Sequence, residues 1–236
     1  MMQCLRGFKL HIFDLDDTLV NTRQSYTEAQ TTAFDSVFRD VEETKRRSHL
    51  ELLYWLCRRF GSGCPEQYFG AFLRCADLSV GDENGILDSL LESYRLAFYE
   101  KIRPLKKVKD YLERLRANGC RLAIVSNGLI ASQEKKMSVA GLDSYFPKEA
   151  RFFSESFPPS LRKPSPHMIS AACSKLDVEG SLSVYYGNEV DDIVAGNLAG
   201  VATVLVGPPK PNESAPHRIA KSDFRLRSWE SVGHFD

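Results

Sequence analysis

The feature that most limits how this chain folds is an alternation of short apolar runs with helical segments after Pro104. Strands are predicted at residues 121–126, 152–154, 183–186 and 202–206, and a short final strand at residues 224–226. Helices are predicted at residues 105–118, 133–140, 166–176 and 191–199. Because strands that alternate with helices form right-handed crossovers, this part of the chain is predicted to form a parallel sheet covered by helices.

One strand of this sheet is separated from the others by a long helical segment. Residues 8–15 form a short apolar run that ends in acidic residues, which is typical of a buried strand. Residues 23–102 instead show helical spacing, with about four helices expected. The predicted fold is therefore α/β, a three-layer Rossmann-like core of residues 1–21 and 104–236 with an all-helical insertion of residues 22–103.

Composition and charge exclude several functional classes. The chain has 236 residues, of which 43% are hydrophobic, so wholesale disorder is excluded. Its 31 basic and 31 acidic residues give a formal net charge of zero, which argues against binding to nucleic acid polymers or membrane surfaces through bulk charge. No apolar run approaches the roughly 20 residues of a membrane span, and we see no signal peptide. Six scattered cysteines without a C-x-x-C pair predict reduced thiols and a cytoplasmic protein.

The polar residues that follow the first strand are candidates for chemistry, since open α/β sheets bind ligands at the carboxyl ends of their strands. Here the sequence carries Asp14, Asp16, Asp17 and Thr18. In a pleated strand Asp14 and Asp16 lie on the same side, and two convergent carboxylates suit a hard cation such as Mg²⁺. An Asp-rich turn that begins a helix, with Thr18 or Asp17 as its N-cap, explains the same residues equally well.

Three further strand ends carry weaker signals. Ser126 and Asn127 offer a hydroxyl and backbone N–H groups that suit an anion, although Ser-Asn-Gly is also typical of a turn. Lys163 precedes a predicted helix, where a lysine is most often a solvated loop residue. Asn188 and Asp192 lie in an acidic segment that is also typical of a helix N-terminus. Four such signals in this order, each at a strand end, support one another.

In this order the motifs resemble those of haloacid dehalogenase superfamily hydrolases, in the subgroup whose helical cap follows the first strand. Residues 13–19 resemble the first motif of the family, D-x-D-x-T, and Ser126 resembles the second. Lys163 resembles the third motif, and residues 187–193 resemble the fourth. The segment that contains Gln133 and Lys136 is most similar to small-molecule phosphatases of this superfamily.

The resemblance implies a Mg²⁺-dependent phosphatase that acts on a small phosphorylated metabolite of the nucleotide or sugar phosphate class. Asp14 is then the nucleophile that forms an aspartyl-phosphate, and Asp16 is the acid and base. Lys163, Ser126 and the N–H of Asn127 are expected to bind the phosphate. An acid at position 16 also disfavours cleavage of a carbon–halogen bond.

The same resemblance implies a metal site formed by Asp14, the backbone carbonyl of Asp16 and the side chain at position 188. Thr18 and Asp192 are expected to support these ligands. The fourth motif of the family usually begins Gly-Asp, whereas this chain has Asn188, whose amide oxygen brings no charge. We therefore expect a high Mg²⁺ requirement.

Two alternatives remain open from the sequence. One is a sugar-phosphate mutase of the same fold, and the other is a catalytically weak binding or regulatory protein, which Asn188 favours. The chain is expected to be a monomer or a homodimer.

Overall fold

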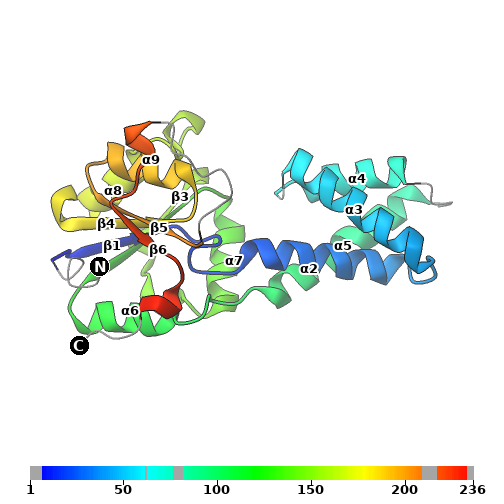
Figure 1. Cartoon of the computed structure of the whole chain (residues 1–236), viewed down its shortest axis with the longest axis horizontal. Helices are drawn as coiled ribbons and strands as arrows, with labels where there is room; N and C mark the ends of the chain where they lie inside the picture. Colours follow the sequence, from blue (N-terminus) through cyan, green and yellow to red (C-terminus); the bar gives the residue numbers. More distant parts are fainter. Residues whose placement is uncertain (1–6, 62, 77–81, 209–216, 233–236) are drawn as a thin grey trace. The chain divides into compact units, whose positions relative to one another are not determined.

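The computed structural model describes residues 7–61, 63–76, 82–208 and 217–232 (Figure 1). The chain divides into two compact units, one of Met1–Asn21 with Arg103–Asp236 and one of Thr22–Ile102. Five cysteines lie in the described part, and all five are free thiols. Cys4 lies outside the described residues.

The first unit is built on a six-stranded parallel sheet with the strand order β3-β2-β1-β4-β5-β6. The strands are β1 (Leu10–Phe13), β2 (Arg121–Ser126), β3 (Arg151–Phe153), β4 (Ser183–Gly187), β5 (Ala202–Val206) and β6 (Phe224–Leu226). The order reverses between β1 and β4, so the chain passes from one half of the sheet to the other at this point. In open α/β sheets, the carboxyl ends of strands next to such a reversal are where ligands bind.

Helices cover both faces of this sheet (Figure 1). They are α6 (Val108–Ala117), α7 (Ile130–Ala140), α8 (His167–Lys175) and α9 (Val190–Leu198). Short 3-10 turns lie at Asp143–Tyr145, Lys148–Ala150, Ser154–Ser156, Pro159–Leu161, Gly180–Leu182, Arg218–Ala220 and Trp229–Val232. Figure 1 places α8 and α9 on one face and α6 on the other, and α8 packs against β1, β2 and β3. The α/β fold class predicted from the sequence is confirmed.

Strand β1 is the centre of the sheet and is buried on both faces, as parallel strands usually are. Leu10 and Ile12 belong to an apolar cluster that also contains Met168 and Ile169 of α8. The predicted strand at residues 8–15 is longer than β1, which ends at Phe13 before the chain turns at Asp17. The predicted bounds of β2 and β5 are correct.

The opposite face of β1 carries a cluster of rings. Phe13 stacks on Tyr186 with ring centroids 4.6 Å apart, and Trp229 lies 5.0 Å from the Tyr111 ring of α6. The Nδ1 atom of His11 lies 2.9 Å from the Tyr186 hydroxyl. Since Trp229 also donates from Nε1 to the Thr18 carbonyl at 2.7 Å, the C-terminal segment is tied to the loop that follows β1.

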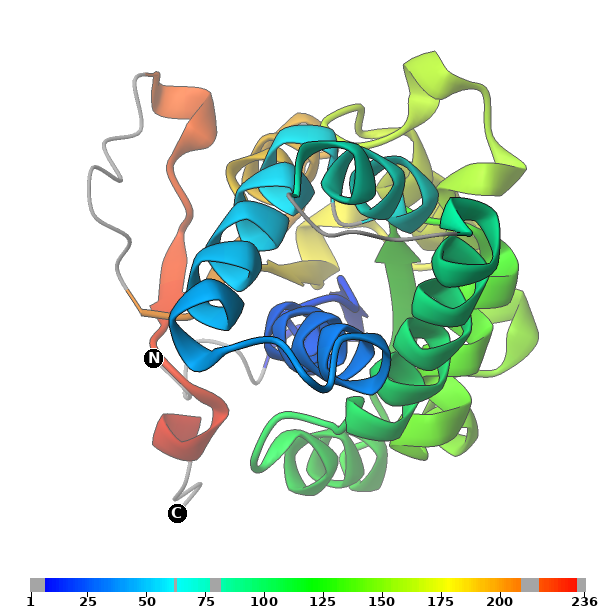
Figure 2. The ribbon, with the colours of Figure 1, turned by 90° about the vertical axis from the view of Figure 1, so that its right-hand side faces the viewer.

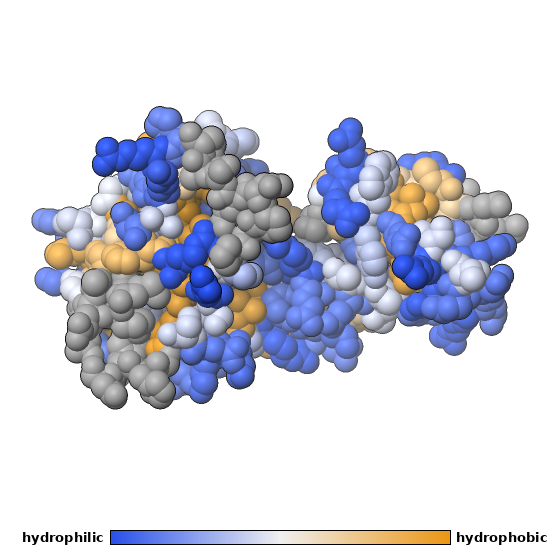
Figure 3. Space-filling view, viewed as in Figure 1, coloured by the Kyte–Doolittle hydropathy of each residue, from blue (hydrophilic) through white to orange (hydrophobic). Residues whose placement is uncertain are grey.

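The second unit contains four helices within the residues that the structure describes: α2 (Thr22–Val37), α3 (Glu43–Phe60), α4 (Pro65–Cys75) and α5 (Glu83–Lys101). Helix α2 packs against α5 and α3 packs against α4 (Figure 2). Polar residues such as Arg23, Gln24 and Thr27 occupy the exposed side of α2, which is hydrophilic in Figure 3. None of the described helices has the length and apolar character that a membrane crossing requires.

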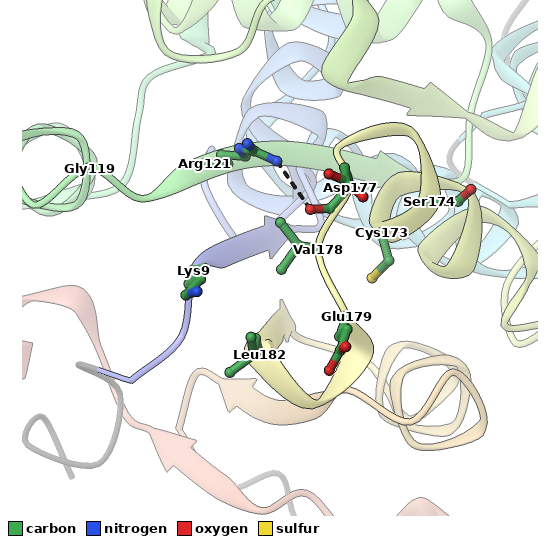
Figure 4. Close-up of a pocket in the computed structure, with 9 residues that line it drawn as sticks. All are labelled: Lys9, Gly119, Arg121, Cys173, Ser174, Asp177, Val178, Glu179 and Leu182. Atoms are coloured by element: carbon green, nitrogen blue, oxygen red, sulfur yellow. Dashed lines mark hydrogen bonds between the residues drawn. The ribbon is translucent and has the colours of Figure 1, made fainter.

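The amino ends of the strands form a hollow of about 690 Å³ on the first unit (Figure 4). Arg121 lies in this hollow and donates to the backbone carbonyls of Leu176 and Asp177, which follow the end of α8. Its guanidinium therefore satisfies carbonyl groups that a helix end leaves without partners. Lys9, Asp177 and Glu179 also line the hollow, so its walls carry charges of both signs.

Burial of His11 gives the fold a pH dependence that can be measured. Burial lowers the pKa of His11 to about 4 from its ordinary 6.5, although a contact with the Phe8 backbone raises it slightly. Between pH 6.5 and 4 the unfolded chain binds a proton that the folded chain does not. For each unit that the pH falls within this window, His11 therefore lowers the free energy of unfolding by about 1.4 kcal/mol.

A His11→Gln variant lacks this linkage. Urea unfolding at pH 7 and pH 5 is expected to show that the wild type loses about 2 kcal/mol more stability than the variant. An equal loss in both proteins would show that His11 is not held neutral by the fold.

Candidate active site

The loop after β1 brings its polar side chains together by a turn. The Asp14 backbone N–H donates to the Tyr186 carbonyl at 2.8 Å, and the chain then turns through Asp17, whose φ of 54° is left-handed. Asp14 and Asp16 both lie beyond the end of β1, so the strand is shorter than predicted, but both side chains border the same hollow. The N-cap interpretation is wrong, since α2 begins only at Thr22.

Lys163 forms the centre of the site. Its Nζ atom lies 2.7 Å from Asp14 Oδ1 and 2.6 Å from Asp192 Oδ1, and it donates to the Tyr185 hydroxyl at 3.0 Å. All three charged side chains are at most 7% exposed. The sequence favoured a solvated loop lysine when this position was taken alone, whereas the structure buries it between two carboxylates.

These contacts shift the protonation of the buried groups. Burial raises the pKa of Asp14, an effect that Lys163 opposes and that Asp192 and Asp16 reinforce. Burial also disfavours the charged form of Lys163, but the Asp14 and Asp192 carboxylates more than offset this and raise the pKa of its ammonium group. Lys163 is therefore a fixed positive charge at neutral pH.

The loop after β2 holds both Asp14 and Lys163. Ser126 donates from Oγ to Asp14 Oδ1 at 2.9 Å. The Asn127 side chain donates to the Lys163 carbonyl at 3.1 Å and accepts from the Lys163 N–H at 3.2 Å. This two-point contact fixes the backbone of a loop that is distant in sequence.

The loop after β4 is shaped by Asp192. Its Oδ2 atom accepts from the N–H groups of Asn188 and Glu189, each at 3.0 Å. A Cβ atom at Gly187 would lie 2.2 Å from the Asp192 Cβ, so only glycine allows this approach. Asp192 therefore orients both Lys163 and the backbone around Asn188.

Asp16 is directed toward α7. Lys136 donates from Nζ to Asp16 Oδ1 at 2.7 Å, and Gln133 donates from Nε2 to Asp16 Oδ2 at 3.0 Å. The same Gln133 nitrogen lies 2.9 Å from Ser126 Oγ. No role was assigned to Gln133 or Lys136 from the sequence, although both lie in the segment that resembled phosphatases.

The residues around Asp14 fit a hard divalent cation. Thr18 Oγ1 lies 3.2 Å from Asp14 Oδ2 and 3.5 Å from Asn188 Oδ1, so one hydroxyl brings both oxygens together. A hollow of about 220 Å³ lies between Asp14, Asp16, Lys163 and Asn188. Within the described residues no three Asp, Glu, His or Cys side chains cluster as a metal site. The candidate donors are the Asp14 carboxylate, the Asp16 backbone carbonyl and the neutral Asn188 amide, all of which offer the oxygen ligands that Mg²⁺ prefers.

A family model for haloacid dehalogenase-like hydrolases matches residues 8–200 of this chain. The chain belongs to this family. The match includes all four loops that meet at Lys163, and the family is one of enzymes. The resemblance inferred from the motifs is confirmed.

Curated relatives and solved structures agree with this assignment. The chain is 28% identical to a glyceraldehyde 3-phosphate phosphatase of Methanopyrus kandleri over 88% of each chain. It is 26% identical to a phosphoglycolate phosphatase of Aquifex aeolicus over 87% of this chain and 88% of the relative. The magnesium-bound structure of the hydrolase YfnB from Bacillus subtilis has the same fold, with a TM-score of 0.69, 20% identity, and coverage of 95% of this chain and 96% of that one.

Tyr185 is the site residue that sequence reasoning missed most clearly. It lies inside β4, where an aromatic residue indicates only a buried strand. Its hydroxyl lies 3.1 Å from Asp192 Oδ1 and 3.1 Å from the Val125 carbonyl. Burial, with the Asp192 charge, keeps the pKa of Tyr185 well above its ordinary value, so the hydroxyl keeps its proton and can donate it.

A Tyr185→Phe variant is expected to have a free energy of unfolding about 2 kcal/mol lower than that of the wild type. The reason is the loss of hydrogen bonds to the charged Lys163 and Asp192 side chains. Tyr111→Phe is the matched control, since its hydroxyl lies 2.6 Å from the neutral Tyr186 hydroxyl, and a loss of about 1 kcal/mol is expected. Urea unfolding measures both variants. Equal losses would show that Tyr185 does not support the charged residues.

An Asn188→Asp variant is expected to bind Mg²⁺ at least about tenfold more tightly, because it adds a charge beside the cation. Calorimetric titration with Mg²⁺ measures this. Ser138→Asp adds the same charge at an exposed position on α7 and is expected to leave the affinity unchanged. An unchanged affinity in Asn188→Asp would show that Asn188 is not a ligand.

Proposed function

We propose that this protein is a Mg²⁺-dependent phosphatase of a small phosphorylated metabolite. The observation that carries the proposal is the buried Asp14 carboxylate, held by Lys163 and Ser126 at the carboxyl edge of the sheet. A nucleophile, a fixed cation and a hydroxyl donor thus meet at one point. The names of the curated relatives, which are phosphatases of small phosphate esters, support the same class of reaction.

The first half of the reaction forms an aspartyl-phosphate. A carboxylate oxygen of Asp14 attacks phosphorus, and the bond from phosphorus to the leaving oxygen breaks. Asp16 gives its proton to that oxygen as it leaves. Ser126 Oγ, the Asn127 N–H and the Lys163 ammonium hold the phosphoryl oxygens.

The second half releases inorganic phosphate. Asp16 takes a proton from water, the water oxygen attacks phosphorus, and the bond from phosphorus to Asp14 breaks. Asp14, Asp16 and Asn188 would hold the metal ion, which would supply positive charge beside the phosphoryl group. Thr18 and Asp192 keep Asp14, Asn188 and Lys163 in place.

Substrate choice is proposed to lie with the helical unit, as the resemblance to cap-containing family members implies. Glyceraldehyde 3-phosphate and phosphoglycolate are the first substrates to test, because they appear in the names of relatives. Nucleoside monophosphates and sugar phosphates follow. Movement of phosphate within a sugar, without release to solution, would instead indicate the mutase alternative.

The test is release of inorganic phosphate from these substrates, and from a generic aryl phosphate, with and without Mg²⁺. Asp14→Asn is expected to lower the rate at least about a thousandfold, because the attacking carboxylate is lost. Asp177→Asn, a matched change in the hollow at the opposite edge of the sheet, is expected to keep wild-type activity.

Two results would contradict the proposal. One is wild-type protein that releases no phosphate from any of these compounds with Mg²⁺ present. The other is an Asp14→Asn variant that is as active as the wild type.

A further inference from the structure

The carboxylate of Asp16 is held at both of its oxygens by helix α7. Lys136 pairs with Oδ1 at 2.7 Å, and Gln133 donates to Oδ2 at 3.0 Å. The Lys136 side chain is only 5% exposed, whereas that of Asp16 is 29% exposed. The carboxylate thus borders on solvent while the group that holds it is buried.

A buried lysine in this place needs a reason. Removing an ammonium group from water costs several kcal/mol, and a solvated Asp16 would need no partner. The phosphate does not require this second lysine, since Lys163 already supplies a buried cation beside Asp14. The charge of Lys136 is directed at Asp16 instead.

Gln133 connects this pair to the loop after β2. Its Nε2 atom lies 2.9 Å from Ser126 Oγ and 3.2 Å from the Asn127 carbonyl, besides its contact with Asp16. The side chain is 1% exposed, so its position is set by packing. One amide therefore fixes the distance between the Asp16 carboxyl and the residues assigned to phosphate.

We propose that Lys136 and Gln133 are positioning residues that hold the Asp16 carboxyl at the point of proton transfer, an inference that rests on the proposed function. They touch neither the phosphate nor the nucleophile in this assignment. The effect of Lys136, which pairs with Asp16, is confined to steps in which Asp16 gives or takes a proton, whereas Gln133 also contacts Ser126 and Asn127.

Loss of Lys136 is therefore expected to affect two kinds of substrate differently. An alkyl leaving group needs the Asp16 proton, so cleavage of an alkyl phosphate slows when Asp16 is loosely held. A dinitrophenolate leaving group needs no proton, so formation of the aspartyl-phosphate from dinitrophenyl phosphate stays fast. Attack of water on that intermediate still needs Asp16 as a base and becomes slow.

The experiment is rapid-mixing kinetics of Lys136→Met with both substrates. With the alkyl phosphate, turnover is expected to fall at least about tenfold. With dinitrophenyl phosphate, one equivalent of dinitrophenolate is expected at the wild-type rate, followed by turnover at least about tenfold slower than in the wild type. Lys136→Arg, which keeps the charge, is expected to restore part of both losses.

Controls separate this role from a structural one. Lys135→Met changes an exposed neighbour on the same helix and is expected to behave as wild type with both substrates. Lys136→Gln removes the same charge with a smaller change in polarity and supplies the same kinetic comparison if Lys136→Met does not fold. Thermal unfolding with and without Mg²⁺ establishes that each variant folds.

Two results would overturn the inference while leaving the phosphatase proposal intact. One is an equal loss of the first-turnover rate with both substrates, which indicates a general distortion of the site. The other is wild-type kinetics in Lys136→Met. Absence of phosphate release from the wild type itself is a different outcome, because it contradicts the proposed function on which the inference rests.

Discussion

The buried ammonium group of Lys163, held between Asp14 and Asp192, is the interaction on which the rest of this site depends. Two carboxylates taken out of water repel each other and are each costly to bury, so a cation must lie between them. The same cation reduces the electrostatic repulsion between the Asp14 carboxylate and an approaching phosphate ester. Each pair of like unit charges at about 4 Å costs about 4 kcal/mol at an effective dielectric constant of about 20. Lys163 therefore both stabilises the buried carboxylates and lowers the repulsion that a phosphate ester meets.

The parallel sheet makes this arrangement possible. β1, β2 and β4 end at the same edge, next to the point where the strand order reverses. Their loops supply Asp14, Ser126 and Asp192, and the loop before α8 supplies Lys163. Side chains far apart in sequence are then locked by short polar contacts, such as the two-point bond between the Asn127 side chain and the Lys163 backbone.

Much of this could be predicted from the sequence, because apolar periodicity defines the strands and the motifs follow their ends. The site residues Asp14, Ser126 and Lys163 meet where the pattern placed them. The turn through Asp17 could not be predicted from strand periodicity, nor could the pairing of the Asp16 carboxylate with Lys136 of α7. The roles of Tyr185 and Trp229 could not be predicted either. The sequence indicates that both rings are buried, but it does not indicate which polar atom the Tyr185 hydroxyl or the Trp229 N–H contacts.

Trapping of the covalent intermediate tests the central claim most directly. The protein is mixed with dinitrophenyl phosphate and Mg²⁺, denatured in acid within the first turnover, and reduced with borohydride, which converts an aspartyl-phosphate to homoserine. Peptide mass spectrometry is predicted to find homoserine in place of Asp14 and at no other position. An unmodified Asp14 in protein that has released dinitrophenolate, or homoserine at another acidic residue, would contradict the account.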